Sequence, residues 1–156
     1  MSPDMLPLVL AAPLLVAMAV SDVRHMRIPN ALVLAMLALF VVTAPFALAP
    51  AEIALRLGVG ALVFALGLAG FVAGMLAGGD VKGLAALMLF VPTGALAPFA
   101  FTFSAAMLAG IALTLGLRRA IGSPGSRYVS LAVDKGYPMG LSIALAGLLL
   151  PLTAGL

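Results

Sequence analysis

Long stretches without a charged residue constrain what this chain can fold into. No Asp, Glu, Lys or Arg occurs within residues 28–51, 57–79 or 83–117. A mean hydropathy of +1.30 and a charged fraction of 8% leave too little polar surface for a soluble domain of 156 residues. A transmembrane helix needs about 20 apolar residues. The sequence therefore predicts an all-α membrane protein, a polytopic bundle of about six transmembrane helices that forms one domain over residues 1–156.

The predicted spans follow the apolar runs, and the turns fall where charges or Pro and Gly interrupt them. The first run has no basic residue at its start, so we expect a span there rather than a secretory signal. No charge separates the fourth span from the fifth, which predicts a tight turn or a re-entrant segment at Val91-Pro92-Thr93-Gly94 or near Pro98. The six predicted spans are 5–21, 31–48, 55–77, 83–99, 100–117 and 138–155.

A row of glycines is predicted on the third span. Gly70, Gly74 and Gly78 recur at intervals of four residues. Small residues at that spacing share one face of a helix and let a neighbouring helix approach closely. We therefore expect this face to pack against a partner helix next to Asp80.

Basic residues are divided unequally between the two ends of the predicted bundle. With six spans, the loops at 22–30, 78–82 and 118–137 share one side and hold seven of the eight Lys and Arg residues, while the other side holds only Arg56. The positive-inside rule places the seven in the cytoplasm. Orientation and contact with anionic lipid account for them, so nucleic-acid binding is not predicted. The seven are Arg24, Arg27, Lys82, Arg118, Arg119, Arg127 and Lys135.

The composition also bounds the chemistry. The chain contains no Cys, which excludes disulfides and thiolate metal sites. Its single His, His25, lies in a basic loop without the partners that a zinc site needs. We predict no metal and no organic cofactor.

Two aspartates stand at the ends of apolar runs on the predicted cytoplasmic side. Carboxylates beside a membrane span are energetically expensive and usually mark a functional site. Asp22 precedes a short connector that ends in Ile28-Pro29-Asn30, and Asp80 follows Gly78 and Gly79, which leave room for another backbone. Two neighbouring carboxyls that share one proton can act as the base and the acid of peptide hydrolysis.

Each of these polar residues also has a structural interpretation. Asp80 could cap the helix that follows it, and Asp22 could form a surface ion pair with Arg24 or Arg27. Lys82 could tune Asp80 or contact lipid phosphate, and anchoring at the interface is the simpler role. Asp134 has no motif around it.

Taken together, the two aspartate motifs resemble the type IV prepilin peptidase family, membrane aspartyl proteases with a Gly-x-Gly-Asp signature at the second aspartate. The resemblance is carried by Asp22 with Ile28-Pro29-Asn30 and by Gly79-Asp80-Val81-Lys82, and more weakly by Lys135-Gly136-Tyr137-Pro138-Met139-Gly140. Ala77 stands where the family has the first glycine of its signature. Larger members carry a methyltransferase region with a four-cysteine metal site. Because this sequence contains no Cys, it is expected to resemble the short, peptidase-only members associated with Flp-type (tight adherence) pili.

The resemblance implies an intramembrane aspartyl endopeptidase that cleaves the basic leader of a type IV (Flp-type) prepilin at the cytoplasmic face of a bacterial inner membrane. Asp22 and Asp80 would be catalytic, with Gly78, Gly79 and Lys82 in support, and the partners would be the prepilin and membrane lipid. Two alternatives remain open. One is a small proton- or cation-coupled transporter that uses the same two aspartates, and the other is a non-catalytic assembly factor. The sequence does not indicate which pilin is cut or an oligomeric state.

Overall fold

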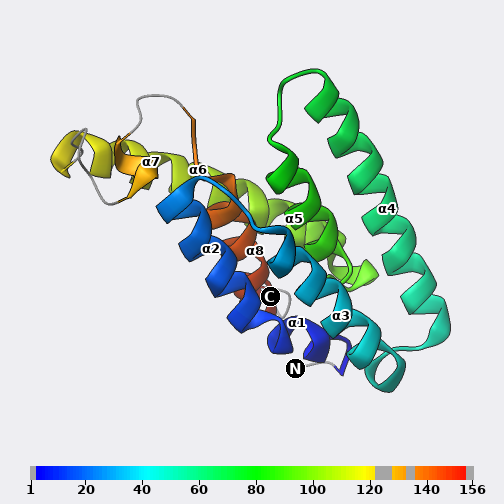
Figure 1. Cartoon of the computed structure of the whole chain (residues 1–156). Helices are drawn as coiled ribbons and strands as arrows, with labels where there is room; N and C mark the ends of the chain where they lie inside the picture. The colour runs from blue at the N-terminus through cyan, green and yellow to red at the C-terminus, as the bar shows by residue number, and fades with distance from the viewer. Residues whose placement is uncertain (1–2, 122–127, 133–135, 154–156) are drawn as a thin grey trace.

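The chain is a bundle of helices (Figure 1), described here from a computed structural model that covers residues 3–121, 128–132 and 136–153. The described part contains no strand, and three of its helical stretches, Asn30–Ala47, Pro50–Val72 and Thr93–Ala120, are long and apolar enough to cross a membrane. The predicted all-α membrane fold is therefore confirmed. The helices are α1 (Leu6–Leu10), α2 (Ala12–His25), α3 (Asn30–Ala47), α4 (Pro50–Val72), α5 (Gly78–Met88), α6 (Leu96–Ile121), α7 (Val129–Ala132) and α8 (Met139–Thr153), with 3-10 turns η1 (Pro3–Met5) and η2 (Thr93–Ala95).

Helix α2 continues one turn beyond the predicted end of the first span. It ends at His25, and Met26 closes it in the left-handed conformation, with φ of 52°, while its N–H donates to the Asp22 carbonyl at 2.7 Å. Asp22 therefore lies in the last turn of a helix rather than after it. The predicted start of the second span is confirmed, because Pro29 is extended and α3 begins at Asn30.

Helix α4 begins and ends five residues earlier than predicted. Pro50 occupies its first turn, where the missing N–H of proline is harmless. The chain leaves the helix after Val72, and Gly74 takes a left-handed φ of 74° that favours glycine. Gly70, Gly74 and Gly78 consequently do not share a helix face, and the predicted glycine row is wrong.

Helix α5 is only 11 residues long. At 1.5 Å per residue it reaches about 16 Å, roughly half of a bilayer core. The chain turns at Leu89–Pro92, and α6 starts at Leu96 after a single 3-10 turn. The predicted fourth span, 83–99, is therefore wrong at both ends: its helix starts earlier, and the break falls at Val91-Pro92-Thr93-Gly94 rather than at Pro98.

The short helix α5 lies at the centre of the arrangement. It packs against α4, α8 and α3, and α8 in turn packs against α2 and α6. The side chains of Leu87 and Phe90 are fully buried, and the Phe90 ring meets that of Phe40 on α3 edge-on, with 5.6 Å between their centroids. Helix α4 packs mainly on α5 and lies at the right-hand edge of the molecule in Figure 1.

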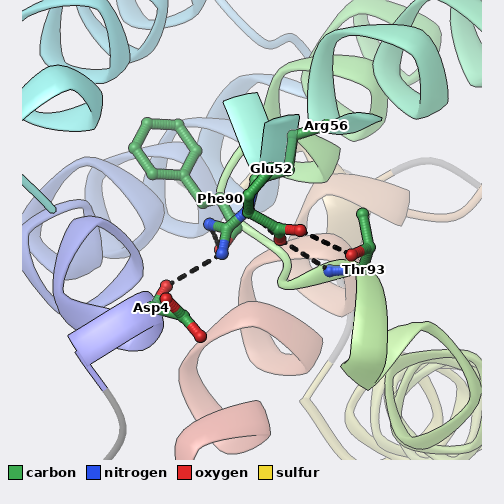
Figure 2. A network of polar contacts seen from close by, with 5 residues as sticks. All are labelled: Asp4, Glu52, Arg56, Phe90 and Thr93. Carbon is green, nitrogen blue, oxygen red and sulfur yellow. Dashed lines mark hydrogen bonds and ion pairs between the residues drawn. The ribbon is translucent and has the colours of Figure 1, made fainter. Parts of the chain in front are cut away.

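A polar cluster around the buried Arg56 side chain connects α4 to η1 and to the segment after α5, at the end of the bundle where α4 begins (Figure 2). The Arg56 side chain is 0% exposed and donates to the Glu52 carboxylate at 2.7 Å, the Phe90 carbonyl at 3.2 Å and the Asp4 carbonyl at 3.1 Å. The same carboxylate accepts the N–H of Thr93 at 2.9 Å and its hydroxyl at 2.6 Å. The cluster thereby satisfies a buried carbonyl in the non-helical segment after α5.

Candidate active site

The first aspartate is held between two helices. Asp22 projects from the last turn of α2, is 4% exposed, and accepts the backbone N–H of Gly140, at the start of α8, at 2.7 Å. A methyl group in place of the Gly140 hydrogen would lie 2.9 Å from the Asp22 Oδ2 atom, so the contact depends on glycine. Among the described residues, neither Arg24 nor Arg27 forms an ion pair with Asp22. The surface ion pair considered from the sequence is therefore absent there.

The second aspartate lies in the first turn of α5. The cap residue of this helix is Ala77, and Asp80 is its third residue, so Asp80 does not cap the helix. The capping interpretation is wrong because α5 starts two residues before Asp80. The connector between α2 and α3 packs here, and a Cβ at position 79 would lie 3.4 Å from the Ile28 Cβ, an ordinary contact distance that does not require glycine.

The two predicted catalytic residues line one cavity. Its volume is about 970 Å³, and it lies where the end of α2, the start of α5 and the start of α8 meet. The two sequence motifs are thus brought together, although 57 residues lie between Asp22 and Asp80 in the sequence. Gly79, Lys82, Asn30, Tyr137 and Met26 are among the other residues that line this aspartate cavity.

The two carboxyls influence each other electrostatically. Both lie outside the three long membrane-crossing stretches. Burial, and then the nearby charge of Asp22, raise the pKa of Asp80 from its ordinary value to about 7. Burial also raises the pKa of Asp22, while N–H bonds from Gly140 and Leu141 act in the opposite direction. The site therefore favours one proton on the pair near neutral pH.

The predicted supporting residues have different positions. Lys82 lines the cavity, and its Nζ donates to the Asn30 side-chain oxygen at 2.8 Å. Gly78 starts α5, and a Cβ there would meet the Phe71 ring at an ordinary 3.4 Å, so no close approach requires glycine at this position. His25 is exposed, and its Nδ1 atom lies 3.2 Å from the Ser21 carbonyl oxygen. Asp134, Lys135 and Arg127 fall outside the described residues.

Sequence reasoning missed the contribution of α8. Gly140 contacts Asp22 directly, and Tyr137 lines the cavity while its hydroxyl is hydrogen-bonded to that of Ser142. The Ser142 hydroxyl also lies 2.8 Å from the Ala106 carbonyl on α6. The segment Tyr137-Pro138-Met139-Gly140 was the available signal. In the described part of the chain, no group of three or more His, Asp or Glu residues could hold a metal ion.

Comparison with known proteins identifies the family. The model of the type IV leader peptidase family matches residues 9–115, a region that contains both aspartates. No curated protein and no solved structure matched the chain. The family match covers more than half of the sequence and agrees with the membrane-crossing helices and the paired aspartates. The chain therefore belongs to the type IV leader peptidase family and is a multi-pass membrane protein of a peptidase family.

Proposed function

We propose that this protein is an aspartyl endopeptidase that removes the leader of a type IV prepilin of the Flp type, with Asp22 and Asp80 as its catalytic pair. The observation that carries the proposal is the common cavity of the two aspartates, in which burial and then the charge of Asp22 raise the pKa of Asp80. Membership of the leader peptidase family supports the same reaction.

In the proposed reaction, the ionised Asp22 takes a proton from water while the water oxygen bonds to the scissile carbonyl carbon. The protonated Asp80 gives its proton to the carbonyl oxygen, which avoids a free oxyanion. The tetrahedral diol then breaks down. Asp22 passes its proton to the leaving nitrogen, a hydroxyl proton of the diol returns to Asp80, and the C–N bond breaks. The N–H bonds from α8 to Asp22 and the burial of Asp80 support this division of roles.

The proposed location is a bacterial inner membrane, with the active site facing the cytoplasm. The support is the charge distribution of the sequence, since the segments predicted to lie on the side of the two aspartates hold seven of the eight basic residues. The eighth, Arg56, is buried in a cluster with Glu52 and contributes no exposed charge to the opposite end. A substrate with a short basic leader and a following apolar helix would present its cleavage site at this interface.

Substitution of each aspartate tests the proposal. Asp22→Asn and Asp80→Asn should each lower prepilin cleavage by about 10²- to 10⁴-fold, because the amide cannot transfer the required proton. The double variant should be no worse than either single one, since the residues act as a unit. Cleavage is measured by the gel shift of a co-expressed prepilin, with enzyme abundance measured by blotting.

Asp4→Asn is the matched control, because the Asp4 side chain is exposed and lies at the other end of the bundle. It should cleave as the parent does. Full cleavage by either Asn variant at position 22 or 80 would contradict the two-aspartate mechanism and favour the transporter or the assembly factor.

A further inference from the structure

An apolar groove lies on the outside of the bundle between α3 and α4. Its volume is about 590 Å³, and α5 forms its floor. Leu34 and Leu37 line one wall and Leu57 and Phe64 the other, and all four side chains are exposed. The groove remains open because α3 and α4 make few contacts with each other.

Four small residues line this groove, beside the larger side chains of Leu89 and Lys82. Gly60 and Ala61 on α4 face Ala85 and Ala86 on α5 along it. Small residues of this kind let the backbone of a helix approach closely, whereas larger ones would hold it away. The surface therefore suits an α-helix that lies alongside α3 and α4.

The groove adjoins the aspartate cavity. Asn30 and Lys82 line both, and the Lys82 ammonium donates to the Asn30 oxygen at this junction. No carboxylate in the described part of the chain pairs with Lys82. The ammonium can thus take an acceptor oxygen from an occupant that passes from the groove into the cavity. A peptide that is extended in the cavity offers such oxygens, because its carbonyls lack helical partners.

We propose that this groove binds the apolar helix of the prepilin and thereby places the preceding residues, where the chain is cut, between Asp22 and Asp80. The inference rests on the proposed function and adds the binding surface. The groove supplies apolar contact, its small residues on α4 and α5 admit a helix backbone, and Lys82 marks the point where the substrate chain leaves its helix.

The first test fills the groove and compares two substrates. Ala61 is exposed and lines the groove, whereas Ala65 is exposed one turn further along α4 and does not. The measured quantity is kcat/KM for the full prepilin divided by kcat/KM for a short peptide that lacks the apolar helix. In Ala61→Phe this ratio should fall about tenfold, which corresponds to a loss of about 1.4 kcal/mol in binding. Ala65→Phe should leave this ratio unchanged. An unchanged ratio in Ala61→Phe, or an equal loss in both variants, would overturn the proposal.

The second test needs no catalysis. The chain has no Cys, so a single introduced Cys is unique. In the Asp80→Asn background, Ala61→Cys and Leu37→Cys should form disulfides with a Cys placed in the prepilin helix, and Ala65→Cys should form far less. Equal cross-linking at the three positions, or labelling of position 61 by a photoreactive phospholipid that excess prepilin does not displace, would overturn the groove assignment. Cross-linking without any wild-type cleavage would retain the groove and reject the proposed peptidase function.

Discussion

At the scale of single residues, the absence of a side chain at position 140 fixes where the first carboxylate lies. The N–H of Gly140 binds Asp22, and even a methyl group there would fall within 2.9 Å of the carboxylate oxygen. The second carboxylate has a different support, the turn that carries Gly79 against Ile28. A close contact with glycine therefore positions the first acid, whereas ordinary packing of the first turn of α5 on the connector positions the second.

Gly140→Ala should consequently displace Asp22. We expect prepilin cleavage to fall about 10²-fold, since a shift of about 1 Å in a catalytic group has effects of that size. Gly116→Ala is the matched control, because a Cβ at position 116 meets nothing within 4 Å. Cleavage is measured at equal enzyme abundance, and undiminished activity of Gly140→Ala would show that this contact does not position the acid.

The raised pKa of Asp80 predicts a specific pH dependence. Proton donation requires protonated Asp80, so kcat/KM should decline as the pH rises through about 7. In the folded state Asp80 keeps its proton up to a pH of about 7, whereas in the unfolded chain it releases the proton near its ordinary pKa of 3.8. The free energy of unfolding should therefore fall as the pH rises from 3.8 to about 7.

The Asp80→Asn variant separates this effect from catalysis. It should unfold at a higher temperature than the parent at about pH 8 and differ much less at about pH 5, because only the ionised carboxylate is penalised by burial. Thermal unfolding in detergent, carried out on the variant and the parent at each pH, measures these differences. A pH-independent difference would mean that Asp80 does not titrate in this range.

At the scale of elements, close packing of α4 on α5 sets the position of Asp80. A Cβ at Gly67 would lie 2.7 Å from the Val81 side chain, and one at Gly60 would lie 2.8 Å from Leu89. Val81 is the neighbour of Asp80, so this contact determines how far the first turn of α5 lies from α4.

Gly67→Leu should therefore force the two helices apart. We expect a loss of about 2 kcal/mol in unfolding free energy, typical of overpacking, together with reduced cleavage. Gly58→Leu on the same helix is the control, because a Cβ there meets open space. Equal stability of the two variants, measured by thermal unfolding, would contradict the packing argument.

These elements also show what the sequence could predict. The apolar runs identified the helices and the bilayer, and the motifs identified Asp22 and Asp80 as a pair. Periodicity misplaced the glycine face, because a spacing of four residues marks one face only while the helix continues, and the chain turns at Gly74. The contact between Gly140 and Asp22 spans 118 positions and has no local pattern, so only the tertiary structure reveals it.

At the scale of the whole molecule, the two ends of the bundle differ in construction. The aspartate end carries the cavity and most of the basic residues, whereas at the other end Arg56 connects α4 to η1 and to the segment after α5. The sequence identified Arg56 only as the single basic residue on the predicted outer side. Its burial leaves that side with hardly any exposed positive charge and sharpens the asymmetry.

Removal of this guanidinium should destabilise the whole bundle. Arg56→Met leaves Glu52 without its cation and Phe90 without its donor, a change that typically lowers the free energy of unfolding by about 3 kcal/mol. Arg119→Met is the control, since Arg119 is exposed and should change stability by less than about 0.5 kcal/mol. Indistinguishable unfolding temperatures for these variants would show that the cluster contributes little.

The buried Arg56 cluster has a consequence for motion. Its hydrogen bonds hold the start of α4 in place. Along its length α4 packs mainly on α5, and its other end leads into the turn that contains Gly74. The close contact of Gly67 with Val81 also holds α4 to α5 near that other end, whereas α3 and α4 make few contacts with each other. Thermal motion should thus change the distance between α3 and α4 more than that between α4 and α5, and the space between α3 and α4 should vary in width where a substrate chain would have to enter.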